Sequence, residues 1–351
     1  MLALSAADCV SPAIQRTRDF LFRPFRWGTY LKLGLVAIIT EGSAYHSRAS
    51  NGGGAPSHNG PVIQGPWDFA PLEIAAVAAA VLGAILLLMW LFYLITRLRF
   101  AFFHCLVYNT REIRPGWRLY REPAWRFFWL NVVVGLCFVL LAAVLIMPFA
   151  AGIWRVLLQA QHGGGPDFTL LFSLLLPLIP LIFLLLLAGF AIDVVLRDWI
   201  MPHFAVDNAT ALEAWRAVWG SVRTEKRQFL VYAILRAALP AVAMALVFMV
   251  LLIPGLMVAG SIGALIYAIH TAFAGSTGGA AEAGLLVQVF FGVVAFLLML
   301  LFGICVGGPV STGIREYALI FYGGRYRTLG DLLYSPVTQP APIGGPSGTR
   351  G

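Results

Sequence analysis

Long apolar blocks separated by short basic stretches dominate the pattern of this chain. A helix needs about 20 apolar residues to cross roughly 30 Å of hydrocarbon at 1.5 Å per residue. Five blocks reach that length: residues 72–96, 128–151, 168–192, 229–254 and 284–306. None of them alternates apolar and polar positions over about ten residues, as a membrane β-strand would. The pattern therefore predicts five transmembrane helices.

A shorter apolar block, residues 27–41, contains Lys32 and is interpreted as a further span. The reason is the distribution of basic residues, because Lys and Arg concentrate in loops that stay in the cytoplasm. Most of the 24 basic residues fall in the N-terminal arm, in residues 97–126, in residues 197–227 and after residue 315. Six crossings leave all four stretches on one side. We expect a multi-pass protein of the bacterial cytoplasmic (inner) membrane with both termini cytoplasmic.

The connectors between spans contain an internal repeat of roughly 100 residues. His104 and Asn109 in the first connector correspond to His203 and Asn208 in the second. Together with the Gly-rich loops on the other side, this predicts an all-α fold of three parallel hairpin repeats. We expect a single membrane domain over residues 1–334 and a flexible Pro- and Gly-rich tail over 335–351.

The basic stretches are expected to form amphipathic helices on the inner membrane surface. In the second connector, Asn208 or Thr210 can cap such a helix. Its apolar positions would share one face, with Glu213 and the arginines turned to water. That face comprises Leu212, Trp215, Val218, Trp219 and Val222.

Composition supports the membrane assignment and limits the chemistry. The chain has 351 residues, of which 60% are hydrophobic and 11% charged, against about a quarter charged in soluble domains. These values exclude a soluble, disordered or disulfide-rich secreted protein. Lys32 and Lys226 are the two lysines, and neither lies in a phosphate-binding GxxxxGK[ST] loop. We therefore expect no enzymatic activity, no cofactor and no metal site.

Charged residues inside the apolar blocks are candidates for a role in the membrane, because burying a charge there is costly. Asp193 lies in the fourth span, four residues before Arg197, and Arg236 lies in the fifth. Asp193 can pair with Arg197 on its own helix or with Arg236 on another. The pair is interpreted as a structural staple, and a proton or ion relay is the alternative.

Lipid headgroups are the expected partners of the basic connectors, because arginine pairs with lipid phosphate while aromatic rings lie at headgroup depth. A second membrane protein or another copy of the chain is an alternative partner, and no nucleic acid is expected. The candidate headgroup contacts are Arg23, Arg26, His104, Arg118, Arg121, Arg126, His203, Arg216 and Arg227.

Three short motifs add a family resemblance. They are Phe22-Arg23-Pro24-Phe25-Arg26, Asp198-Trp199-Ile200-Met201-Pro202, and Ala211-Leu212-Glu213-Ala214-Trp215 followed by Phe229. With them the chain resembles a group of bacterial and archaeal six-span membrane proteins of unknown function, similar in style to the membrane domain of glycerophosphodiester phosphodiesterases. The resemblance implies a topology. It transfers no catalytic residue, because the catalytic barrel that accompanies that domain elsewhere is missing here.

The leading functional interpretation is a non-enzymatic protein that contacts lipid or a membrane partner through its basic, aromatic cytoplasmic surface. The alternative is a transporter or channel for a small or amphipathic solute. It would use the proline-broken fourth and fifth spans, which contain Pro177, Pro180 and Pro240. A membrane-embedded lipid enzyme is least favoured, because no cluster of acid, base and nucleophile is visible.

Overall fold

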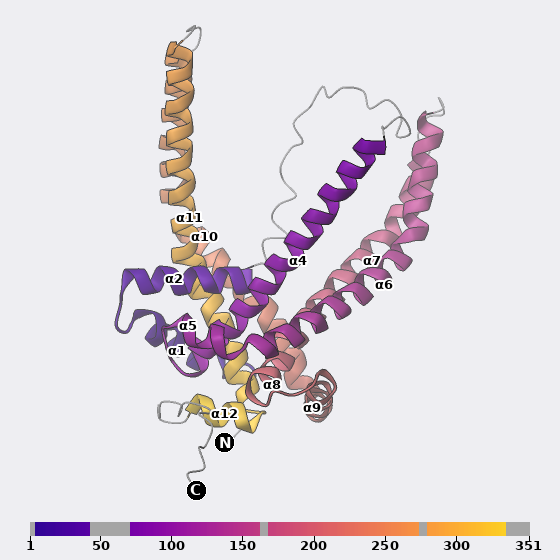
Figure 1. Cartoon of the computed structure of the whole chain (residues 1–351), viewed down its shortest axis with the longest axis vertical. Coiled ribbons are helices and arrows are strands. Elements are labelled where there is room, and N and C mark those ends of the chain that lie inside the picture. Colours follow the sequence, from indigo (N-terminus) through magenta and orange to yellow (C-terminus); the bar gives the residue numbers. More distant parts are fainter. Residues whose placement is uncertain (1–3, 43–70, 162–167, 274–278, 335–351) are drawn as a thin grey trace. The chain divides into compact units, whose positions relative to one another are not determined.

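The computed structural model describes residues 4–42, 71–161, 168–273 and 279–334, and within these ranges the chain forms helices without any strand (Figure 1). The predicted all-α class is thereby confirmed. The predicted tail and most of the Gly-rich loops lie outside the described residues. In chain order the helices are α1 (Val10–Phe22), α2 (Trp27–Ala37), η1 (Ile38–Gly42), α4 (Pro71–Val107), α5 (Ile113–Leu119), α6 (Arg121–Gln161), α7 (Phe168–Val194), η3 (Val195–Ile200), α8 (Met201–Val206), α9 (Ala211–Thr224), α10 (Lys226–Phe273), α11 (Gly279–Gly323) and α12 (Arg327–Tyr334).

Five helical stretches in the described part of the chain are long and apolar enough to cross a membrane, so the chain has the features of a multi-pass membrane protein. They are Ala75–Val107, Arg121–Val156, Phe172–Val206, Lys226–Val250 and Leu286–Gly323. Each contains most of one of the five long apolar blocks predicted from the sequence. The sixth expected span, residues 27–41, is not among them. It forms 11 residues of α2 followed by the 5-residue π-helix η1, and about 20 residues are needed.

The helix α2 runs across α11 and not along it (Figure 1). The Tyr30 hydroxyl donates a hydrogen bond to the Cys305 carbonyl oxygen at 2.6 Å. One turn later Gly34 lies against Ile304, and after another turn Ile38 lies against Gly307. Successive turns of α2 thus meet a single turn of α11, which is the geometry of crossing helices.

The chain divides into two compact units. The first unit combines both ends of the sequence, residues 1–64 and 230–351, with residues 101–116. It contains α1, α2, α11, α12, most of α10 and the end of α4. The second unit comprises residues 65–100 and 117–229, with most of α4, α6, α7, α8 and α9. Each unit therefore has its own core.

The helix α4, which contains the apolar block 72–96, extends further than predicted. The sequence analysis ends the second span at residue 96, but α4 runs to Val107. Phe100, Phe103 and Leu106 are almost completely buried in this extension. The apolar pattern of the connector is therefore used to pack against protein, and only the residues after Val107 turn away from the helix.

A left-handed asparagine follows α4 and α8. Asn109 has φ 52° and Asn208 has φ 51°, and they are the non-glycine residues with positive φ in the described ranges. Asparagine tolerates this conformation, which often ends a helix. A short helix comes next in both places, α5 after Asn109 and α9 after Asn208. This local likeness agrees with the predicted repeat, but the arrangement as three parallel hairpins stays a prediction.

Candidate lipid-contact surface and buried ion pairs

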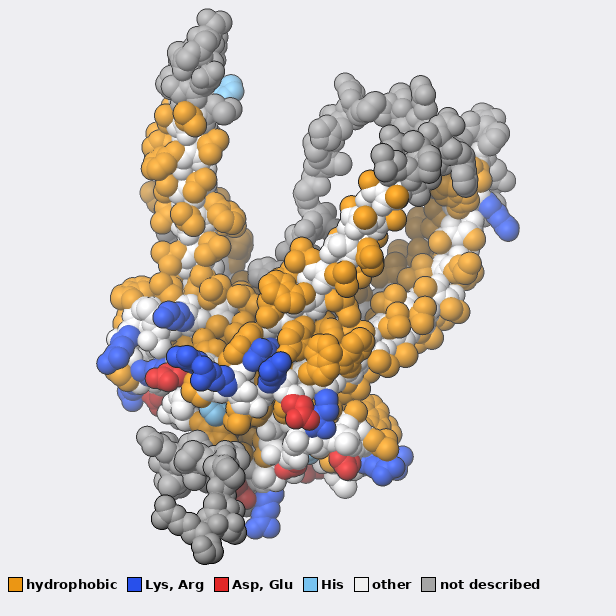
Figure 2. Space-filling view, in the orientation of Figure 1, with side chains coloured by type: hydrophobic (Ala, Val, Ile, Leu, Met, Phe, Trp, Pro, Cys, Tyr) orange, Lys and Arg blue, Asp and Glu red, His pale blue; other side chains and the backbone are white. Residues whose placement is uncertain are grey.

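Exposed arginines stand beside exposed aromatic rings in three parts of the chain, here called the basic aromatic segments. Segment one is residues 22–27, segment two is residues 118–129 and segment three is α9. In Figure 2 the long helices of each unit are covered by hydrophobic side chains, while most basic side chains gather over the short helices. This division matches a helix bundle whose arginines stay at the membrane boundary.

Segment one joins α1 to α2. Phe22, Phe25 and Trp27 are all exposed, and the Phe25 and Trp27 ring centroids are 5.1 Å apart. Arg23 and Arg26 lie between them in the sequence and are also exposed. An ion pair joins Arg23 to Asp19 at 3.3 Å, but both side chains are in solvent, where such a pair contributes little. Both arginines therefore remain accessible.

Segment two begins at the end of α5 and continues into α6. Arg118 and Arg121 are exposed, and the exposed rings of Trp125 and Trp129 follow on α6. Arg126 differs from its neighbours. It is half-buried and donates hydrogen bonds to the carbonyl and side-chain oxygens of Asn208. The structure thus separates Arg126, which binds the turn before α9, from the two exposed arginines.

Segment three, the helix α9, begins with a capping box. The Glu213 amide donates to the Thr210 hydroxyl at 3.4 Å, and the Thr210 amide donates to the Glu213 carboxylate at 2.9 Å. The hydrogen bond from the Thr210 backbone lowers the pKa of Glu213 below its ordinary value. Of the two predicted caps, Thr210 is the one used, and Asn208 forms the preceding turn.

The faces of α9 differ from the sequence expectation. Ala214 and Val218 are the buried positions, whereas Trp215 and Trp219 are exposed and stack on each other at 6.2 Å. The guanidinium of Arg223 lies 5.1 Å from the Trp219 ring centroid, so this arginine is on the tryptophan side of the helix. Sequence reasoning placed Val218 with the tryptophans and Arg223 opposite them, because it assumed a single apolar face.

The two repeated histidines are not part of the exposed surface. His104 and His203 are both buried. The His104 ring lies 4.6 Å from the Tyr108 ring, and His203 Nδ1 lies 3.7 Å from an Asp207 carboxylate oxygen. Arg216 and Arg227, by contrast, are exposed. Of the candidate headgroup contacts, the arginines other than Arg126 therefore form the accessible set.

Sequence reasoning missed a set of arginines that bind helix ends. Arg16 of α1 donates to the Leu106 carbonyl oxygen at the end of α4, at 2.7 Å. In return Arg111, which follows α4, donates to the Phe20 carbonyl oxygen at the end of α1, at 3.0 Å. The last carbonyls of a helix have no partner within it, so each arginine completes the other helix. Nothing in the sequence distinguishes these arginines from the exposed ones.

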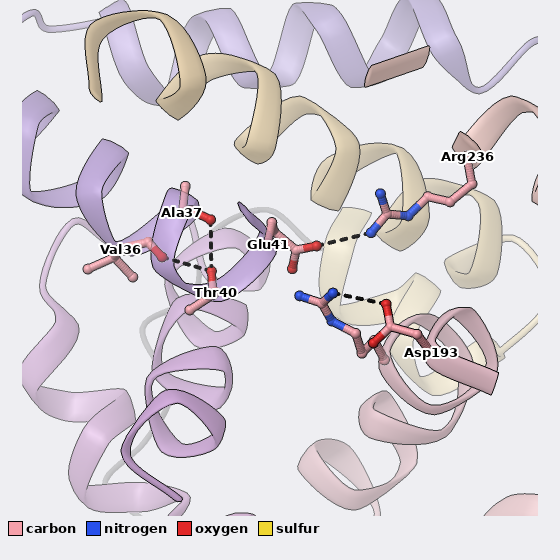
Figure 3. A network of polar contacts seen from close by, with 7 residues as sticks. Val36, Ala37, Thr40, Glu41, Asp193 and Arg236 are labelled. Atoms are coloured by element: carbon pink, nitrogen blue, oxygen red, sulfur yellow. Dashed lines mark hydrogen bonds and ion pairs between the residues drawn. The ribbon is translucent and has the colours of Figure 1, made fainter. Parts of the chain in front are cut away.

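Two of the three predicted intramembrane charges pair with each other, and the third has a different partner (Figure 3). Arg197 Nη1 lies 3.0 Å from the carboxylate of Asp193, one turn earlier. Arg236 lies 3.0 Å from the carboxylate of Glu41 in η1, and both are nearly inaccessible, at 3% and 2%. Glu41 was overlooked because it stands at the very end of the first apolar block.

A second buried carboxylate was also overlooked. Glu316 of α11 is fully buried, and Arg16 Nε lies 3.1 Å from it. Arg16 therefore joins α1, α11 and the end of α4. Across the described ranges, no group of three or more His, Cys, Asp or Glu side chains is placed to hold a metal ion.

The model of a family of unknown function (DUF7544) matches residues 4–332. The chain belongs to this family. No curated protein and no solved structure matches the chain. The DUF7544 match includes all three basic aromatic segments and the ion pairs described above, but the family description states no activity. The resemblance to the phosphodiesterase membrane domain accordingly stays a prediction.

Proposed function

We propose that this DUF7544 protein is a non-enzymatic, multi-pass protein of the bacterial cytoplasmic membrane that binds anionic lipid headgroups through its basic aromatic segments. The observation that carries the proposal is the exposure of arginine and aromatic side chains side by side in all three segments. Segments two and three directly precede the long apolar helices α6 and α10, which would hold them at headgroup depth. Segment one joins the short helices α1 and α2.

The chemistry of these side chains fits a phosphate-bearing lipid. Guanidinium groups form charge-assisted, often bidentate hydrogen bonds to phosphate, and indole rings favour the membrane–water interface. A basic side chain near an anionic leaflet contributes about 1 kcal/mol. The formal net charge of +8 has the sign that such a surface requires.

In this proposal both ends of the chain lie on the same side of the membrane. Arg325 Nη1 donates to the Leu4 carbonyl oxygen at 3.3 Å, and Arg16 Nη1 donates to the Leu333 carbonyl oxygen at 3.3 Å. Because these hydrogen bonds join the two ends of the chain, the proposal requires an even number of crossings. The five candidate spans are an odd number, so one further crossing has to be added to them. The excess of arginine supports the cytoplasm as that side.

Lipid retention tests the proposal directly. We expect protein in nanodiscs of mixed phosphatidylglycerol and phosphatidylcholine to retain phosphatidylglycerol selectively, as measured by native mass spectrometry. The double variant Arg118→Gln and Arg121→Gln should weaken this retention several-fold. Arg155→Gln is the matched control, because Arg155 is exposed near the other end of α6. Equal retention of the two lipids by the unmodified protein refutes the proposal.

The transporter alternative depends on the charged residues of the apolar helices. Asp193 and Arg236 each have an oppositely charged neighbour at 3.0 Å, which supports a stapling role for both. Coupled uptake that depends on Asp193 would favour transport instead. The leading proposal requires no such dependence.

A further inference from the structure

The helix α9 carries arginine and tryptophan on a single outward face. Five of its exposed residues follow the pattern i, i+3, i+4, i+7 and i+11, which places them on one side of a helix. They are Leu212, Trp215, Arg216, Trp219 and Arg223. This outward face is amphipathic, because it combines arginine with leucine and tryptophan. Such a face is suited to the membrane–water interface and not to water or hydrocarbon alone.

The opposite side of α9 is fixed to the protein. Ala214 is completely buried and Val218 nearly so. The capping box at Thr210 and Glu213 sets the first turn, and Arg126 holds the preceding turn through Asn208. A helix anchored in this way does not have to fold or reorient when it meets a ligand, which reduces the entropy cost of binding.

The position of α9 in the chain determines what its outward face meets. The candidate span Phe172–Val206 ends just before α9, and the candidate span Lys226–Val250 begins just after it. A 14-residue helix between two spans is held at the membrane boundary. The stacked tryptophans belong at that depth, where amphipathic rings are enriched. The bilayer in which the two spans lie is therefore the occupant of this face.

We propose that α9 is a preformed binding shelf for anionic glycerophospholipid. Trp215 and Trp219 lie among the glycerol and upper acyl groups, and Arg216 and Arg223 bind the phosphate of the same lipid layer. Glu213, the acidic residue of the first turn, has its carboxylate engaged by the Thr210 amide at 2.9 Å. The inference rests on the proposed function and names α9 as a specific lipid-binding element among the three segments.

Paired variants in nanodiscs test the shelf. The double variant Arg216→Gln and Arg223→Gln removes two contributions of about 1 kcal/mol each, so phosphatidylglycerol binding should weaken about 25-fold. Replacing Trp215 and Trp219 by Ala should also weaken binding, whereas replacement by Phe should restore part of it. The control Ala217→Gln alters an exposed position off this face and should leave binding unchanged.

A second measurement reports contact independently of affinity. Lipids brominated near the headgroup should quench tryptophan fluorescence less in the variant with Phe at positions 215 and 219 than in the unmodified protein. Thermal unfolding checks that each variant is folded. Selective retention that persists unchanged in the α9 variants overturns the shelf but leaves the proposed function standing. If the unmodified protein shows no preference for phosphatidylglycerol, both the α9 proposal and the proposed function are refuted.

Discussion

The contact between α2 and α11 depends on two glycines and permits a sharp test. A Cβ atom on Gly308 would lie 2.7 Å from the Cα of Gly34 and 3.5 Å from its carbonyl carbon. Both are backbone atoms of the opposite helix, so no side chain can rotate away. We expect Gly308→Ala to push the helices apart and to strain the hydrogen bond from Tyr30 to the Cys305 carbonyl. Overpacking of this kind costs about 1–3 kcal/mol.

The matched control is Gly303→Ala on the same helix, where an added Cβ meets nothing within 4 Å. Both changes gain the same helix propensity, about 1 kcal/mol, so their difference isolates the steric cost. Thermal unfolding in nanodiscs should show Gly308→Ala melting several degrees below Gly303→Ala, with faster amide hydrogen exchange in α2. Equal melting temperatures for the two variants would show that α2 does not cross α11 in this way.

Three further predictions concern the charged groups. Removing one partner of the buried pair, by Glu41→Gln or Arg236→Gln, leaves an isolated buried charge and should cost about 3–5 kcal/mol in thermal unfolding. The double variant should recover part of that loss, and full additivity would argue against a direct pair. Asp193 is 39% exposed but Arg197 is buried, so Asp193→Asn removes one acceptor from a buried guanidinium and should cost about 1–3 kcal/mol, less than breaking the Glu41–Arg236 pair. Loss of a coupled uptake without loss of stability would instead favour a transporter. The pKa of Glu213 is lowered in the folded protein from its ordinary value of 4.5, so the capping box stabilises α9 above about pH 4.5 and weakens as the pH falls through the folded value. The protection of α9 amides, measured as the exchange rate relative to the intrinsic rate at each pH, should fall over that acidic range in the unmodified protein but not in Glu213→Gln, and identical protection profiles would contradict the assignment.

The long helices were predictable because their signal is local. Twenty consecutive apolar residues define a candidate span whatever surrounds them, and α6 illustrates this through residues 128–151. The block at 27–41 is not confirmed as a span, because its pattern is equally consistent with a helix that packs across another. The direction of α2 relative to α11 is determined by the close approach of Gly34 and Gly308, which lie far apart in the sequence.

The candidate site was predictable in kind but not in detail. Alternation of arginine with aromatic residues indicates an interfacial surface, and the exposed Arg118 and Arg121 agree with that expectation. The sequence does not reveal that Arg126 is engaged by Asn208, or that Val218 and not Trp219 turns inward on α9. Both depend on which neighbouring helix supplies a carbonyl or a cavity, and this is a property of the tertiary structure.

The first unit joins the beginning and the end of the chain, and this has a consequence for biogenesis. Arg16 is synthesised about 300 residues before its partner Glu316, which corresponds to about 15–60 s of translation. During that interval α1 and α2 are already made but lack the helix against which they pack. A ribosome that stalls before α11 therefore releases a chain whose N-terminal arm has no docking partner. Such truncated products should be preferred substrates of membrane proteases.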